Sequence, residues 1–128
     1  MLRLAGWWWI GVSVLHSVGG IILYYPQWQE IEESGWFNVI APDPFTPIFP
    51  RETALWFILL SPFIYVVGEL CLWAHRQKLG FPVSIGVILF ATMLVAVFFV
   101  PSSGFWLGLP PSIMMLFPSK ASQSLHGD

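Results

Sequence analysis

The chain has 128 residues, the length of a single domain; 56% of them are hydrophobic and only 9% carry a charge. Ordinary soluble domains have roughly 25% charged residues. A small protein also has a large surface to cover, so we expect lipid rather than water to contact most of the outside. The net charge of −2 and the lack of a basic run argue against a nucleic-acid partner, which would require a clustered cationic surface.

Apolar segments follow one another along the chain and predict an all-α fold. We expect an integral membrane four-helix bundle that forms one transmembrane domain over residues 1–128. A helix needs about 20 apolar residues to cross a hydrocarbon core of roughly 30 Å. The expected spans, the last of them shorter than this length, are residues 4–25, 53–77, 82–100 and 104–117.

The first segment, residues 4–25, follows Arg3 and contains no Asp, Glu, Lys or Arg. It is longer than the apolar region of a cleaved signal peptide and lacks a small-residue cleavage site, so we expect a retained signal anchor. Polar and small residues recur at helical spacing on one face of this segment. They are Ser13, His16, Ser17 and Gly20.

The long connection that follows, residues 26–52, is expected to lie outside the cytoplasm. Its first part alternates apolar with acidic residues, which predicts a short interfacial helix over residues 27–35 that ends at Gly35. Four prolines in residues 41–50 predict an extended and stiff chain there.

The second segment contains Ser61, Tyr65 and Glu69 at helical spacing, and this stripe is expected to face the stripe of the first segment. Arg51 lies just before the segment, next to Glu52. We expect Arg51 either to form an interface pair or to lie at the rim of an outward-opening pocket, where it could bind a carboxylate or a lipid phosphate.

The third and fourth segments are joined by a short uncharged turn. Pro82 stands near the first helical position of the third segment, where its missing N–H costs little. In the fourth segment, Pro110-Pro111 is expected to break the helix, which predicts a short kinked span or a re-entrant segment.

Basic residues predict the orientation in the membrane, because Lys and Arg concentrate in cytoplasmic loops. Arg3, Arg76, Lys78 and Lys120 fall on one side of the expected spans, whereas the long loop has only Arg51 beside several acidic residues. We therefore expect a multi-pass protein of the cell inner (cytoplasmic) membrane with both termini in the cytoplasm.

Two ionisable residues, His16 and Glu69, lie well inside the expected spans, away from their ends, and should face the interior of the bundle. If the first two spans pack antiparallel, the two side chains lie within about one helical turn of each other. Such a pair could be structural, could anchor a ligand in a lipophilic pocket, or could act as an acid and base.

No cofactor or metal is evident in the sequence. A zinc site would need a third ligand beside His16 and Glu69, and haem ligation by two histidines would need a second buried histidine. Cys71 lies alone within an apolar segment, so we expect a small core residue.

Several short motifs resemble an uncharacterised family of small bacterial four-helix integral membrane proteins, known as a domain of unknown function. The resembling residues extend over most of the chain and are His16, Gly20, Trp28, Gly35, Arg51, Ala54, Trp56, Phe57 and Gly68. The resemblance implies four helices and no established activity. A looser likeness to DoxX-type proteins concerns architecture alone and does not transfer a function.

Three functions remain open from the sequence. We expect first a bundle that binds a lipophilic small molecule or serves as an accessory subunit of a larger membrane complex or homo-oligomer. The binding residues would be Ser13, His16, Ser17, Gly20, Arg51, Ser61, Tyr65 and Glu69. The alternatives are a membrane-embedded isomerase or redox enzyme that uses Glu69 and His16, and a small transporter or proton-coupled channel that acts as an oligomer.

Overall fold

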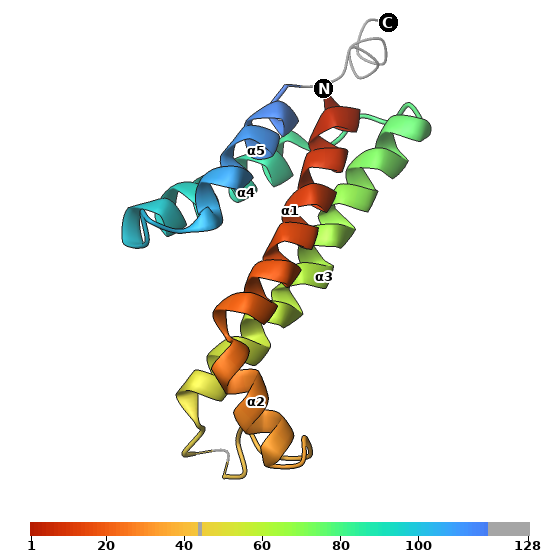
Figure 1. The fold of residues 1–128 in the computed structure, drawn as a ribbon. Helices are drawn as coiled ribbons and strands as arrows, with labels where there is room; N and C mark the ends of the chain where they lie inside the picture. Colours follow the sequence, from red (N-terminus) through yellow and green to blue (C-terminus); the bar gives the residue numbers. More distant parts are fainter. Residues whose placement is uncertain (44, 118–128) are drawn as a thin grey trace, which may run out of the picture. The chain divides into compact units, whose positions relative to one another are not determined.

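A computed structural model describes residues 1–43 and 45–117. Within these residues the secondary structure consists of helices joined by loops, without any strand (Figure 1). The elements are α1 (Leu2–Leu23), α2 (Tyr25–Glu33), α3 (Phe49–Arg76), α4 (Val83–Phe99), the 3-10 helix η1 (Gly104–Gly108) and α5 (Leu109–Met115). The prediction of an all-α fold is confirmed. The tail with Lys120, on which the predicted orientation partly rests, lies outside the described residues.

The helix expected in the loop is α2, which begins and ends about two residues earlier than the sequence predicted. Pro26 stands in its first turn, where a proline costs no helical hydrogen bond. At the other end Gly35 has a φ of 90°. The N–H of Trp36 donates to the Ile31 carbonyl at 3.1 Å, and the N–H of Gly35 donates to the Glu32 carbonyl at 3.0 Å. These two bonds form a Schellman motif, which satisfies the last carbonyls of the helix.

The fourth apolar segment differs in detail from the prediction. It is divided between η1 and α5, but Pro110-Pro111 lies in the first turn of α5 and does not interrupt it. The physical reason is that the first N–H groups of a helix have no intrahelical acceptor, so prolines there remove no bond. The prolines therefore mark where α5 begins.

The chain divides into two compact units, each of which contains part of α1 and part of α3. The first unit comprises Met1–Val12 and Ile64–Asp128, and the second comprises Ser13–Phe63. The prediction of a single domain and the prediction of a four-helix bundle both stay predictions.

In the first unit, four buried residues form the core: Ala5, Trp9, Cys71 and Met115. The indole N–H of Trp9 donates to the Met115 sulfur at 3.4 Å, and the Cys71 thiol lies 3.9 Å from the same sulfur. Helix α5 packs on α4, since a Cβ on Gly86 would lie 2.9 Å from the Met115 backbone. This core thus joins the start of α1, the end of α3 and the end of α5.

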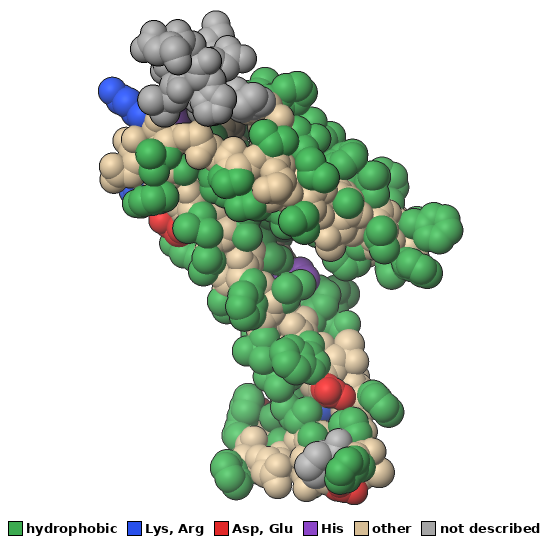
Figure 2. All heavy atoms as spheres, turned by 180° about the vertical axis from the view of Figure 1, so that it is seen from behind, with side chains coloured by type: hydrophobic (Ala, Val, Ile, Leu, Met, Phe, Trp, Pro, Cys, Tyr) green, Lys and Arg blue, Asp and Glu red, His purple; other side chains and the backbone are tan. Residues whose placement is uncertain are grey.

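Two of the helices, α1 and α3, are long and apolar enough to cross a membrane. Only 22% of the most apolar stretch of each helix is buried inside the protein. Hydrophobic side chains cover much of the face drawn in Figure 2. Helix α4 is also apolar but has only 17 residues.

Candidate functional site

Polar side chains of α1 bind backbone carbonyls of α3 within the second unit. The Ser13 hydroxyl donates to the Ser61 carbonyl at 2.8 Å, and His16 Nε2 lies 2.9 Å from the Phe57 carbonyl. A carbonyl only accepts, so Nε2 of His16 carries the proton. The imidazole also stacks on the Phe57 ring, with centroids 3.9 Å apart and planes 11° from parallel.

The other two members of the predicted stripe also lie in the second unit. Ser17 donates to the carbonyl of Ser13 at 3.0 Å within α1. A Cβ on Gly20 would lie 2.6 Å from Ile58 and 2.8 Å from Phe57, so this glycine lets the two helices approach closely. The stripe of α1 is therefore a helix-packing surface that is tied by hydrogen bonds to the Phe57–Ser61 turn of α3.

On α3, one hydroxyl that faces this packing surface has no hydrogen-bond partner among the described residues. It is Ser61 Oγ, which is buried. A serine in a helix commonly donates to the carbonyl four residues earlier. For Ser61 that carbonyl belongs to Phe57, which already accepts from His16.

Tyr65 and Glu69 belong to the first unit and have partners there. The Tyr65 hydroxyl donates to Glu69 Oε1 at 3.3 Å, and Glu69 Oε2 lies 3.7 Å from the Arg76 guanidinium. The Glu69 side chain is 42% exposed. His16 and Glu69 thus each have protein partners within their own unit, and their pairing stays a prediction.

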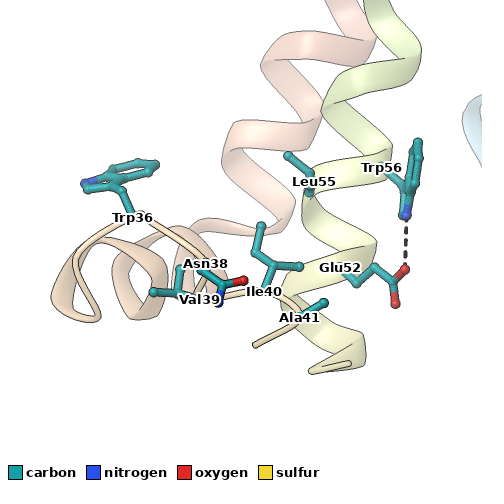
Figure 3. A pocket seen from close by; sticks show the side chains of 8 residues that line it. All are labelled: Trp36, Asn38, Val39, Ile40, Ala41, Glu52, Leu55 and Trp56. Carbon is teal, nitrogen blue, oxygen red and sulfur yellow. Dashed lines mark hydrogen bonds between the residues drawn. The ribbon is translucent and has the colours of Figure 1, made fainter. Parts of the chain in front are cut away.

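A pocket of about 320 Å³ opens between the loop after α2 and the first turns of α3, entirely within the second unit (Figure 3). Most of its lining is apolar; besides the indole N–H groups of two tryptophans, the polar side-chain groups are the amide of Asn38 and the carboxylate of Glu52. The lining residues are Trp36, Asn38, Val39, Ile40, Ala41, Glu52, Leu55 and Trp56. The Trp56 indole N–H donates to Glu52 Oε1 at 3.2 Å.

The loop that lines this pocket holds two residues in the left-handed region. Trp36 has a φ of 65° and Asn38 a φ of 54°. Asparagine tolerates this conformation, but a tryptophan there is strained by about 1–3 kcal/mol. The surrounding hydrogen bonds must therefore hold the loop in place.

Arg51 supplies two of those contacts. Its guanidinium donates to the Val39 carbonyl at 3.0 Å and to Glu30 at 3.3 Å, and its side chain is only 17% exposed. Arg51 therefore ties the pocket-lining loop to α2 and α3. Whether it also binds a carboxylate or phosphate, as the sequence predicted, stays a prediction.

Replacing Arg51 by glutamine should loosen the loop. The charged hydrogen bond to a carbonyl contributes about 1–2 kcal/mol, and the partly exposed pair with Glu30 adds little. Hydrogen exchange of the amides of residues 36–41 should become at least several-fold faster. Arg76→Gln is the matched control, because the Arg76 pair with Glu69 is exposed on both sides; equal exchange in the two variants would contradict the assignment.

Asp43 fixes the turn beyond the pocket. Its carboxylate accepts from the Phe45 N–H at 3.0 Å and from the Thr46 hydroxyl at 2.8 Å, and these bonds lower the pKa of Asp43. Because the folded pKa is lowered, the turn keeps its full stability above the ordinary pKa of aspartate. It loses that stability as the pH falls through the lower value. A pH titration of the Phe45 amide by NMR should therefore show a midpoint below the ordinary value for aspartate, and a midpoint at or above that value would contradict the contact.

A family model described as a family of unknown function (DUF6463) matches residues 1–122. The chain belongs to this family. The resemblance to a domain of unknown function is thereby confirmed. No curated protein and no solved structure matches the chain.

For this member of DUF6463, sequence reasoning missed most of the pocket. Gly35 and Asn38 are turn-forming residues and do signal a bend in the loop. Nothing in the sequence signals that the bend faces Leu55 and Trp56 of α3. Phe57 was missed as the partner of His16, because the contact is made by its backbone carbonyl, which every residue carries.

Proposed function

We propose that this DUF6463 member is a multi-pass protein of the cell inner (cytoplasmic) membrane that acts as a lipophilic-ligand-binding or accessory helical bundle. The observation that carries the proposal is the exposure of the apolar helices α1 and α3. Large side chains such as Leu15 and Ile22 are more than half exposed. In water, each Å² of such surface costs about 25 cal/mol, whereas lipid covers it without cost.

The return of the chain after α4 supports the orientation with both termini in the cytoplasm. Gly108 packs against Met93, and Met115 packs against Gly86 near the start of α4. Helix α5 therefore ends beside the start of α4, and the chain returns to the side from which α4 sets out. Helices α1 and α3 then make the first two passes, α4 the third, and η1 with α5 the fourth. An even number of passes leaves both termini on the same side of the membrane.

Charge distribution supports the same orientation. Ala5 and Cys71 meet Met115 in one core, so the start of α1 and the end of α3 lie near the end of α5. Arg3, Arg76 and Lys78 belong to these ends of the chain. The opposite stretch, from α2 to the first turn of α3, has Arg51 as its basic residue, beside the acidic residues Glu30, Glu32, Glu33, Asp43 and Glu52. This asymmetry fits the positive-inside rule.

Membrane fractionation tests the proposal. After lysis, the chain should stay in the membrane pellet through alkaline carbonate washing, which releases peripheral proteins. A C-terminal fusion to a fluorescent protein that folds only in the cytoplasm should fluoresce, and a fusion to alkaline phosphatase should be inactive. Release by carbonate would overturn the membrane location, and an active phosphatase would overturn the orientation.

The acid–base enzyme that the sequence left open stays a prediction. His16 Nε2 is engaged by the Phe57 carbonyl, and Glu69 Oε2 lies 3.7 Å from the Arg76 guanidinium. An accessory or binding role requires neither group to exchange a proton.

A further inference from the structure

The pocket beside the start of α3 combines a size and a lining that suit a small ligand. A volume of about 320 Å³ lies at the lower end of the range of ligand sites. Apolar side chains of Val39, Ile40 and Leu55 line it, and among the described lining residues Glu52 supplies the one carboxylate. Figure 3 shows Glu52 on the α3 side of the pocket, with its carboxylate directed at Trp56.

Within residues 1–43 and 45–117, Glu52 has no cationic partner. The neighbouring Arg51 is turned to Glu30 and to the Val39 carbonyl. Glu52 accepts from the Trp56 indole N–H, which is a neutral donor. No Lys or Arg belongs to the lining as far as the chain is described, so the negative charge of Glu52 is uncompensated there.

The tryptophan next to Glu52 adds to the attraction for a cation. Trp56 lines the pocket, contacts the Glu52 carboxylate and remains 62% exposed. Trp36 also belongs to the lining, but its ring lies apart from Glu52 and Trp56 (Figure 3). An ammonium group over the face of an indole gains about 0.5–2 kcal/mol. The surrounding apolar side chains suit methyl or methylene groups carried by the same nitrogen.

We propose that this pocket binds an organic ammonium group carried on an apolar skeleton. Glu52 supplies the counter-charge, Trp56 supplies the ring face and holds the carboxylate, and Arg51 positions the loop. The ligand is either a soluble amine or the amine head group of a lipid, which share this chemistry. The inference goes beyond the proposed function and does not depend on it, because the pocket lies within one unit and can be tested in detergent.

Calorimetric titration of the purified full chain in a neutral detergent tests the proposal. The probe is hexyltrimethylammonium, and hexanesulfonate of the same chain length is the anionic control. The cation should bind and the anion should not. Glu52→Gln should weaken binding about tenfold, which corresponds to about 1.4 kcal/mol. Glu33→Gln, on α2 and outside the pocket lining, should leave binding unchanged.

A second variant keeps the test decisive if Glu52→Gln does not fold. Trp56→Leu leaves the carboxylate in place but removes the ring, and it should weaken binding about two- to fivefold. Absence of cation binding to the wild-type chain, equal binding by Glu52→Gln, or preference for the sulfonate would each overturn the proposal.

Lipid nanodiscs distinguish the two sources of the ammonium group. Native mass spectrometry of the chain released from discs of phosphatidylethanolamine and phosphatidylglycerol should show retained ethanolamine lipid if a head group is the ligand, with loss of that lipid in Glu52→Gln. Binding of the soluble cation without selective lipid retention assigns the pocket to a soluble amine. Failure of the carbonate test would leave the titration result standing, so the two proposals fail separately.

Discussion

Replacing Gly68 by alanine is expected to lower the free energy of unfolding by about 1–3 kcal/mol, because the added methyl group has no room. A Cβ at this position would lie 2.8 Å from the Gly6 carbonyl oxygen and 2.8 Å from the Ile10 side chain. A backbone oxygen cannot rotate away as a side-chain tip can, so the ends of α1 and α3 in the first unit would have to separate. Separation would also loosen the contact of Gly6 with Leu72.

The measurement is the thermal midpoint of unfolding in detergent, with unfolding monitored by circular dichroism. Gly11→Ala is the matched control, since nothing lies within 4 Å of the position that its methyl group would take. That control should be unchanged or slightly stabilised, because alanine is favoured over glycine in a helix by up to about 1 kcal/mol. Equal midpoints for the two variants would show that α1 and α3 do not approach closely at Gly68.

Replacing His16 by alanine should destabilise the second unit by about 1–3 kcal/mol. The variant loses the hydrogen bond to the Phe57 carbonyl, which contributes about 0.5–1.5 kcal/mol. It also loses the stacked contact with the Phe57 ring, which contributes a similar amount. A large apolar gap would remain opposite Phe57.

The control for His16→Ala is His75→Ala, at an exposed position near the end of α3. The thermal midpoint should fall for His16→Ala and stay unchanged for His75→Ala. His16→Gln, whose amide can also donate to a carbonyl, should recover part of the loss. If His16→Ala keeps the wild-type midpoint, the histidine does not hold the helices together, and a role in chemistry or ligand binding gains support.

The helices could be predicted because apolar length is a property of local sequence. Residues 4–25 and 53–77 read as predominantly apolar segments, and α1 lies within two residues of the first. Helix α3 begins at Phe49, four residues earlier than predicted, so the expectation of an extended chain was wrong for Phe49 and Pro50. Pro50 stands in the first turn of α3, where a proline removes no helical hydrogen bond. Gly35 could be predicted to end α2, since glycine adopts the left-handed conformation that a Schellman motif requires.

The place of the prolines in the fourth segment could not be predicted from the residues alone. Pro110-Pro111 is incompatible with a helix interior but compatible with a helix start, and the sequence does not say which applies. The answer depends on where η1 ends, and that depends on the packing of Gly108 against Met93. Such a tertiary contact leaves no local signature.

The candidate site could be predicted only in part from the sequence, for a similar reason. Ser13, His16 and Gly20 could be placed on one face of a helix from their spacing, but their acceptors are backbone carbonyls of Phe57 and Ser61. The outer pocket depends on two left-handed residues, of which Trp36 is a residue type that rarely adopts this conformation. Long-range contacts of Arg51 select that conformation.

Cysteine accessibility in intact cells tests most directly the claim that lipid covers the exposed apolar side chains of α1. In a Cys71→Ala background, single cysteines are placed at Leu15, which is 60% exposed, and at Phe45, which is 93% exposed in the loop after α2. A membrane-impermeant maleimide should label Phe45→Cys and leave Leu15→Cys unlabelled until detergent is added. Labelling of Leu15→Cys at the rate of Phe45→Cys without detergent would show that water, not lipid, surrounds α1, and would contradict the account.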